Sequence, residues 1–359
     1  MSAEVLISID AMGGDHGPSV AVPGAALALD RLRGEGRVVR LLLHGDRAKL
    51  DAEIARHPTL QDAEVRHTEL VIAGDEKPSV ALRRGKGSSL WNAVEAVKGA
   101  PRAAAVSAGN TGGLMAIAKL QLRMTAGISR PAIAASWPTA RGVTVLLDVG
   151  ANIDSDAEQL IEFAILGEAF FSAVHAAKAD GRPSVGLLNV GSEDQKGHEE
   201  VREAHQILKR GLIDLDYRGF VEGDDIAKGT VDVVVTDGFT GNVALKTGEG
   251  LARFVSATLR EALTSTLPAK LGAVLASGAL NAMREKLEPP GGGVLLGLSG
   301  TVVKAHGGGT PRGFADAIRI AAHLADSGYA DQVAQNIERV RPELARGKDG
   351  SSVSAETGA

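Results

Sequence analysis

The sequence predicts a doubly wound α/β fold with a mostly parallel sheet, and two features of its patterning support this prediction. Short apolar runs rich in Val, Ile and Leu recur along the chain without polar alternation, as expected of strands buried on both faces of a parallel sheet. Segments with helical spacing of apolar residues separate these runs, and strand followed by helix, repeated, is typical of doubly wound folds.

The elements of the first part of the chain follow this alternation. VLISI at 5–9 and VVRLLLH at 38–44 are continuous apolar runs and predict strands. Between them, VAVPGAALALDRL at 20–32 has the spacing of a helix that covers a sheet. SLWNAVEAVK at 89–98 predicts a further helix, and AAAVS at 103–107 predicts the next strand.

The same alternation continues to the end of the chain. Strands are predicted for VTVLLDV at 143–149, SVGLLNV at 184–190, VDVVVT at 231–236 and VLLGL at 294–298. Helical spacing is found at 158–178 and 199–211, and a helical excursion from the domain is expected around 258–288. No linker rich in Pro, Gly and Ser divides the chain, so we expect a single domain over 1–346 and a flexible polar tail over 347–359.

The composition excludes several classes of function. A net charge of −5 and an aromatic content of 3% argue against nucleic-acid binding, which needs basic surfaces and stacking side chains. The absence of Cys removes disulfides, a Cys nucleophile and thiolate metal sites, and it fits a cytosolic protein. There is no signal-peptide pattern and no apolar stretch near the roughly 18 residues of a membrane span. We therefore expect a cytoplasmic location.

Glycine-rich loops follow most of the predicted strands. Because the carboxyl ends of parallel strands meet at one edge of a sheet, we expect these loops to gather there. Backbone N–H groups of such loops approach anions closely, and the next helix adds a partial positive charge. The same residues are also ordinary turn and cap residues, so one loop alone favours neither interpretation. Six loops together predict a phosphate-like ligand, although neither GxxxxGK[ST] nor a standard GxGxxG fingerprint is present.

The loops, taken together and in order from Ile9 to about Ala322, resemble the phosphate acyltransferase family of bacterial phospholipid synthesis. The resemblance is carried by DAMGGD (10–15), SAGNTGG (107–113), LLDVGAN (146–152), LLNVGSEDQKG (187–197), KGTVDVVVTDGFTGNVALK (228–246) and GGGVLLGLSGTVVKAHG (291–307). It implies a three-layer α/β/α fold related to phosphotransacetylases and isopropylmalate dehydrogenases, in a homodimer. It also implies transfer of a long-chain fatty acyl group from acyl carrier protein to inorganic phosphate, without a cofactor, giving acyl phosphate for phosphatidic acid synthesis.

Phosphate is itself the nucleophile in such a reaction, so the site has to position a dianion and stabilise an oxyanion. With the resemblance, we expect Lys196, Asp237 and Asn242 to be catalytic, although Lys196 would equally suit a solvated surface and Asp237 a helix cap. No metal site is expected. The residues expected to bind substrate are Asp10, Gly13, Gly14, Asp15, Ser107, Gly109, Asn110, Thr111, Gly112, Asn152, Asn189 and His306.

Partners follow from the implied donor. Arg83, Arg84 and Lys86 are expected to contact either the acidic carrier protein or phosphate. The apolar stripe of 267–287 suits a peripheral membrane contact, and equally a dimer or core surface. A downstream acyltransferase that uses acyl phosphate is a further expected partner. Two other functions remain open from the residues: a phosphotransacetylase-type enzyme that uses acyl-coenzyme A, and a non-catalytic anion-binding scaffold.

Overall fold

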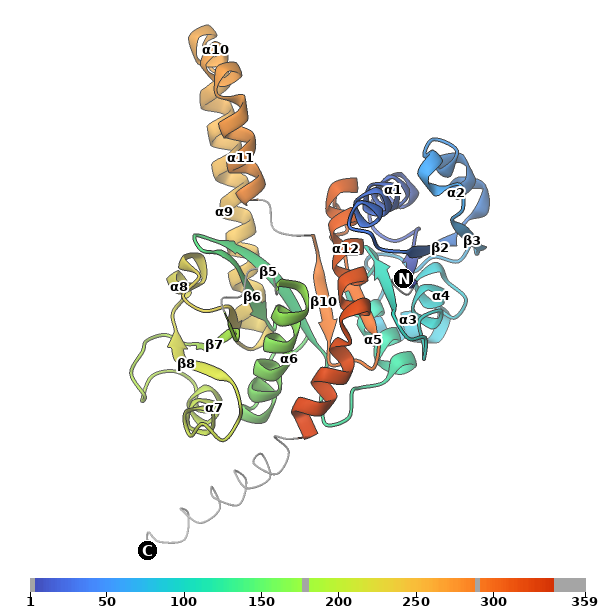
Figure 1. Ribbon diagram of the computed structural model, residues 1–359. Helices are drawn as coiled ribbons and strands as arrows, with labels where there is room; N and C mark the ends of the chain where they lie inside the picture. Colours follow the sequence, from blue (N-terminus) through green and yellow to red (C-terminus); the bar gives the residue numbers. More distant parts are fainter. Residues whose placement is uncertain (1–3, 176–180, 288–290, 339–359) are drawn as a thin grey trace, which may run out of the picture.

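Eleven strands form one continuous sheet in the computed structural model, which describes residues 4–175, 181–287 and 291–338 (Figure 1). The strand order is β3-β2-β1-β4-β11-β10-β5-β6-β9-β7-β8. Most neighbouring pairs are parallel, which confirms the predicted fold class.

The first part of the chain builds one side of the sheet. Its elements are β1 (Val5–Asp10), α1 (Pro18–Gly34), β2 (Val39–Gly45), α2 (Arg47–Ile54), the 3₁₀ turn Pro58–Leu60, β3 (Glu64–His67), α3 (Pro78–Arg84), α4 (Ser89–Glu95), β4 (Ala103–Ser107) and α5 (Thr111–Leu122). The predicted strands and helices of this part are found to within two or three residues at their ends.

The second part builds the other side and then returns to the middle. Its elements are β5 (Ala132–Thr139), β6 (Gly142–Leu147), α6 (Ala157–His175), β7 (Ser184–Leu188), α7 (Glu199–Lys209), β8 (Asp216–Val221), α8 (Gly223–Lys228), β9 (Val233–Val235) and α9 (Gly238–Thr264). The return elements are β10 (Gly293–Leu296), β11 (Thr301–Lys304) and α12 (Pro311–Ser327). The last residues predicted for the helix at 158–178 and the tail at 347–359 lie outside the described residues.

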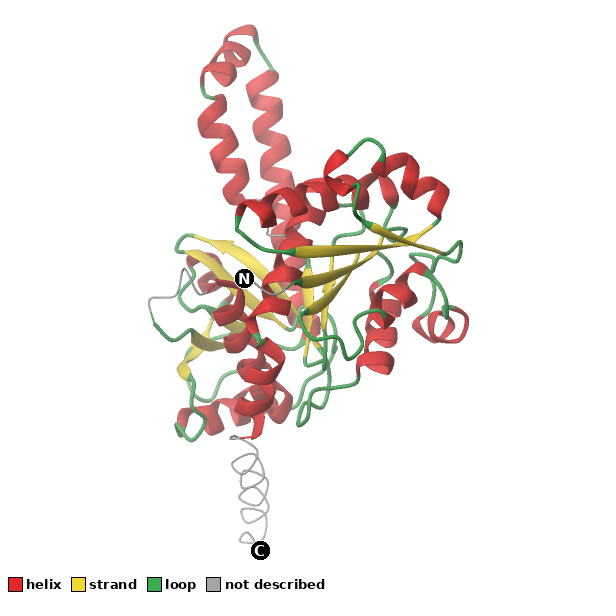
Figure 2. Cartoon of the chain, turned by 45° about the vertical axis from the view of Figure 1, so that its right-hand side comes forward, coloured by secondary structure: helices red, strands yellow, loops and turns green. Residues whose placement is uncertain are grey.

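Helices cover both faces of the sheet, so the molecule has three layers (Figure 2). Alternate residues of β1 show the division, because Ile7 and Ile9 pack among α1, α6 and α12 while Leu6 packs on the opposite face. That opposite face is covered by α3, α4, α5, α8 and α9, through residues such as Leu90 and Leu114. Strands buried on both faces explain why their sequences are apolar without alternation.

The direction of the strands reverses in the middle of the sheet. β10 is antiparallel to both of its neighbours, and β5 is antiparallel to β6. The first half of the sheet (β3-β2-β1-β4-β11) therefore runs opposite to the second half (β6-β9-β7-β8). The expectation that all the glycine-rich loops lie on one carboxyl edge is wrong, because the sequence AIAASWPT of β5, rich in Ala and broken by Pro138, did not indicate a strand.

The two sets of carboxyl ends nevertheless meet. The strands of the two halves are offset along their length. The carboxyl ends of the first half therefore lie level with the carboxyl-terminal residues of the second half, although the two sets of strands run in opposite directions. One row of paired residues crosses the sheet at this height and consists of Asp10, Ser107, Lys304, Gly293, Ala135, Leu146 and Val234. Loops from both halves thus face each other across the centre of the sheet.

A helical arm projects from this body. α9 begins on the sheet and continues outward, and α10 (Leu267–Leu275) and α11 (Ser277–Leu287) turn back beside it (Figure 1). The arm contains the excursion expected around 258–288, although α9 enters it without a break. Among the helices of the described residues, none is long and apolar enough to cross a membrane.

Candidate active site

Three glycine-rich loops of the first half pack tightly on one another. A Cβ atom on Gly13 would lie 2.4 Å from Asp10 Oδ2 and 2.7 Å from the backbone nitrogen of Gly109. Gly14 has a φ of +86°, and a Cβ there would lie 2.9 Å from the carbonyl oxygen of Gly307. The Asp15 N–H donates to that same carbonyl at 2.9 Å. Close contact between loops therefore explains these glycines without a ligand.

Asp10 and Ser107 form the buried base of this loop cluster. The Ser107 hydroxyl donates to Asp10 Oδ2 at 2.6 Å and accepts from the Gly109 N–H at 2.9 Å. Burial raises the pKa of the Asp10 carboxyl, and the hydrogen bond from Ser107 opposes this rise. Both side chains are almost fully buried, so they hold the loops in place from below.

Asn110 fixes the beginning of α5. Its Oδ1 accepts from the Gly113 N–H at 2.7 Å, and its Nδ2 donates to the carbonyls of Gly74 at 2.9 Å and Glu76 at 2.8 Å. Gly112 is needed because a Cβ there would lie 2.7 Å from the ring of Pro78. The polar and small residues of SAGNTGG thus aim the amino terminus of α5, with Thr111 foremost, at the centre of the molecule.

A second loop cluster belongs to β6 and α9. Asp148 accepts from the N–H groups of Ile133 at 2.9 Å and Asn152 at 2.7 Å, and burial raises the pKa of its carboxyl. The Asn152 amide donates to the Pro131 carbonyl at 2.8 Å. Asn242 Nδ2 donates to the Val149 carbonyl at 3.1 Å and so ties α9 to this loop.

A cavity of about 270 Å³ lies between the two clusters, and we call it the central cavity. Residues of both halves line it, and its polar side chains are Thr111, Ser136, Asn242, Lys246, Glu249, Lys304 and His306. Lys246 Nζ lies 2.9 Å from Glu249 Oε2. Two lysines and a helix amino terminus, against one carboxylate, make this small cavity suited to an anion.

Lys304 is a partly buried cation of this cavity. Its Nζ donates to the carbonyl of Ala108 at 3.1 Å and to that of Ala305. Burial lowers the pKa of Lys304 to about 8, while the carboxylates of Asp10 and Asp15 act in the opposite direction. Sequence reasoning missed this residue, although a lysine that closes the apolar strand TVVK just before AHGGG was a usable signal.

His306 follows on the same loop. Partial desolvation lowers the pKa of its imidazole, and the cations Lys246 and Lys304 lower it further against the field of Glu249. A neutral imidazole beside two ammonium groups is able to accept or donate one proton in this cavity.

Lys196, Asn189 and Asp237 lie on the other side of α9. Asn189 Nδ2 donates to the Lys196 carbonyl at 3.1 Å, and Lys196 Nζ lies 3.8 Å from Glu193 on the half-exposed loop after β7. Asp237 caps α9 and accepts from the N–H and the hydroxyl of Thr240 at 2.8 and 2.7 Å. Asn189 and Asp237 line a second cavity of about 710 Å³, so two of the expected catalytic residues, Asn242 and Asp237, lie in different cavities, and Lys196 lines neither.

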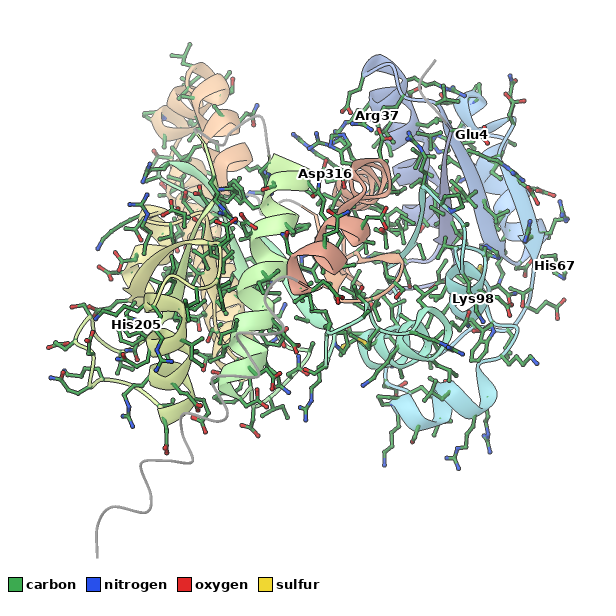
Figure 3. The ribbon with its side chains drawn as sticks, turned by 60° about the horizontal axis from the view of Figure 1, so that its bottom comes forward. Glu4, Arg37, His67, Lys98, His205 and Asp316 are labelled. Atoms are coloured by element: carbon green, nitrogen blue, oxygen red, sulfur yellow. The ribbon has the colours of Figure 1, made fainter. Side chains whose placement is uncertain are left out.

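The basic residues near α3 lie outside both cavities. Arg83, Arg84 and Lys86 are exposed at the end of α3, which packs against α5. Arg83 Nε donates to the Ser79 carbonyl at 3.2 Å. Figure 3 shows the two halves with α6 and α12 between them, His205 on one side and His67 and Lys98 on the other. Within the described ranges, no three His, Asp or Glu side chains are grouped as a metal site would require.

Comparison with known proteins gives the fold and the family. The fold resembles EutD phosphotransacetylase from Staphylococcus aureus, with 15% identity, a TM-score of 0.55 and coverage of 90% of this chain and 94% of that one. It also resembles a putative 4-hydroxythreonine-4-phosphate dehydrogenase from Salmonella typhimurium, with 14% identity, a TM-score of 0.51 and coverage of 90% and 99%. At such identities the likeness concerns the fold alone, and it agrees with the predicted relation to phosphotransacetylases.

The sequence relatives are much closer. The family described as "Fatty acid synthesis protein" matches residues 5–332. A phosphate acyltransferase of Caulobacter vibrioides is 61% identical, over 98% of this chain and 96% of that protein. A phosphate acyltransferase of Phenylobacterium zucineum is 59% identical, over 95% of each. These matches confirm the resemblance found in the loops, and the chain belongs to the phosphate acyltransferase family.

Proposed function

We propose that this acyltransferase moves a long-chain fatty acyl group from acyl carrier protein to inorganic phosphate and so supplies acyl phosphate for phosphatidic acid synthesis. The observation that carries the proposal is the pairing of Lys246 and Lys304, from opposite halves, around one cavity that also receives the amino terminus of α5. Family membership supports an enzyme over a non-catalytic scaffold.

The proposed chemistry needs no cofactor. Phosphate bound between the two lysines attacks the thioester carbonyl through one oxygen, and a C–O bond forms as the carbon–oxygen double bond opens. The oxyanion then collapses, the C–S bond breaks, and the thiolate leaves with its electron pair. Thr111, Asn242 and His306 are within the same cavity and are proposed to orient phosphate and the oxyanion.

We keep Lys196 and Asp237 as proposed functional residues, although Asp237 lines the second cavity and Lys196 lines neither cavity. Asp237 and Asn189 line the second cavity and Lys196 lies in the loop beside it, so we propose that they contact the part of the donor that extends outside the central cavity. Arg83, Arg84 and Lys86 are proposed to contact the acidic carrier protein, because all three are exposed and lie close to α5.

The test measures free thiol released from palmitoyl acyl carrier protein, with and without inorganic phosphate, and traps the product with hydroxylamine. Phosphate-dependent release that yields a hydroxamate is the expected result. Lys196→Ala and Lys304→Met should each lower it at least tenfold, while Lys98→Ala, at an exposed lysine that lines neither cavity, should not. Release only from palmitoyl-coenzyme A would favour the phosphotransacetylase-type alternative, and no release from either donor would refute both enzymatic readings.

The arm is proposed to make the peripheral membrane contact. Leu267, Leu271, Val274 and Leu275 are between 68% and 89% exposed at its end, beside the exposed Lys270. Apolar side chains flanked by cations suit the interface of an anionic membrane. Leu271→Asp should abolish sedimentation with anionic vesicles and leave thiol release intact; unchanged sedimentation would contradict this contact. We further propose a homodimer and a downstream acyltransferase that consumes the acyl phosphate.

A further inference from the structure

We propose that a groove between α9 and the end of β5 holds the fatty acyl chain of the donor, an assignment that rests on the proposed function. The groove has a volume of about 470 Å³, and we call it the acyl groove. Its walls are mainly apolar and include Trp137, Pro138, Leu245, Leu251, Ala252 and Val255.

The acyl groove lies next to the central cavity. Leu245 and Glu249 line both spaces, so a thioester whose carbonyl lies beside the phosphate directs its hydrocarbon chain into the groove. Strand β5 also passes from one space to the next: Ala135 and Ser136 line the central cavity, and the following residue, Trp137, lines the acyl groove.

Polarity changes along this path as an acyl phosphate or acyl thioester requires. The central cavity carries Lys246, Lys304 and His306. Among the described residues that line the acyl groove, one is charged, and this residue, Glu249, also lines the central cavity. A ligand with an anionic head and an apolar tail matches this order.

The floor of the groove depends on Gly248. A Cβ at this position would lie 2.0 Å from Cη2 of Trp137, so the glycine is what lets the edge of the indole ring contact α9. On the rim, Leu251 is 60% exposed and Val255 is 44% exposed. Large apolar side chains left open along one groove are typical of a surface that an apolar ligand covers.

The lining residues on α9 extend from Leu245 to Val255, along the part of this helix that leads to the arm. A second route exists, because the second cavity shares Trp137, Ala227 and Gly248 with the groove. The second cavity shares no residue with the central cavity, whereas the groove does, and this favours the groove for the chain attached to the reacting carbonyl.

The test fills the far end of the groove and varies the donor. Ala252→Phe should lower kcat/KM for hexadecanoyl acyl carrier protein at least tenfold and leave butanoyl acyl carrier protein within twofold, since each methylene that loses its apolar contacts costs about fourfold. Ala257→Phe, an exposed position on the same helix beyond the groove, is the matched control and should change neither. Val243→Phe fills the second cavity instead and should show no selectivity by chain length.

Three outcomes would overturn the assignment: equal losses for both donors, selectivity in Val243→Phe rather than Ala252→Phe, or loss of activity together with a changed oligomeric state in ultracentrifugation. A binding measurement separates this proposal from the proposed function. Trp91→Phe leaves Trp137 as the single Trp, and hexadecylphosphonate should shift its emission to the blue where methylphosphonate does not. A blue shift without any turnover would support the acyl groove and refute the proposed reaction. Turnover without a blue shift would support the proposed reaction and refute the acyl groove.

Discussion

Replacement of Lys304 by Met separates the two roles that a partly buried lysine can have. Met preserves an unbranched side chain and removes the charge. Burial holds the pKa of Lys304 at about 8 instead of 10.5, which corresponds to a penalty of about 3 kcal/mol for the charged form in the folded protein. Because the folded-state pKa is lowered, this penalty is present in full below about pH 8 and disappears as the pH rises toward the unfolded value of 10.5.

Lys304→Met should therefore leave the free energy of unfolding at pH 7 unchanged or raise it by up to about 3 kcal/mol. The affinity for phosphate, in contrast, should fall. A hydrogen bond to a charged group contributes about 1.5–3 kcal/mol, so the KM for phosphate should rise by roughly tenfold to a hundredfold or slightly more. A stable protein with weakened phosphate binding is the signature of a lysine kept for its ligand.

The assay is thiol release at saturating donor over a series of phosphate concentrations, with urea unfolding of the same samples. Wild-type activity should fall as the pH rises above about 8, when Lys304 loses its proton. Lys304→Arg should retain activity at pH 9, because its guanidinium keeps its charge there. A KM for phosphate within twofold of wild type in Lys304→Met, with a lower unfolding free energy, would refute the reasoning and make Lys304 a structural residue.

Three further predictions concern the loops, the core and the second cavity. Gly13→Ala should lower the melting temperature and abolish activity, since its Cβ would lie 2.4 Å from Asp10, whereas Gly34→Ala, with nothing within 4 Å, should do neither; equal effects would contradict the loop packing. His44 bonds the Ser8 hydroxyl at 2.9 Å, and burial lowers the pKa of its imidazole from 6.5 to about 4. Since the folded-state pKa is lowered, stability present above pH 6.5 is lost on acidification, by about 2 kcal/mol between pH 7 and pH 5 in urea unfolding; the loss should vanish in His44→Gln. Asp237→Asn keeps a good helix cap and should lower kcat at least tenfold without a change in melting temperature; unaltered kcat would reduce Asp237 to a cap.

The fold was predictable wherever burial on both faces made a strand continuously apolar. Val5–Asp10 and Ala103–Ser107 are of this kind. β5 was not, because Ser136, Pro138 and Thr139 interrupt its apolar run, and a Pro within a run argues against a strand. Missing one strand of a hairpin reversed the inferred direction of all that followed it, since the turn between Thr139 and Gly142 is what inverts the second half.

The sequence predicted which loops form the site, but it did not predict which charged side chains line the central cavity. Asn110 and Gly112 stand out in the sequence, yet their contacts show that they mainly aim α5 and admit Pro78. Lys304 does not stand out, because its importance arises from burial beside Asp10, which is 294 positions away in the chain and two strands away in the sheet. Periodicity reports which residues are buried, whereas the charge of a cavity depends on which strands become neighbours.

The reversal of the sheet has a consequence for the anion. In a single parallel sheet one set of loops would surround a ligand from one side, but here Lys304 belongs to the first half and Lys246 to the helix that follows the second half. Their charges act on a shared neighbour, since both lower the pKa of His306. Like charges placed across a small cavity repel unless an anion lies between them. Glu249 already offsets the charge of Lys246 at 2.9 Å, so a dianion in the central cavity would share Lys246 with this carboxylate and gain Lys304 as its second charged partner.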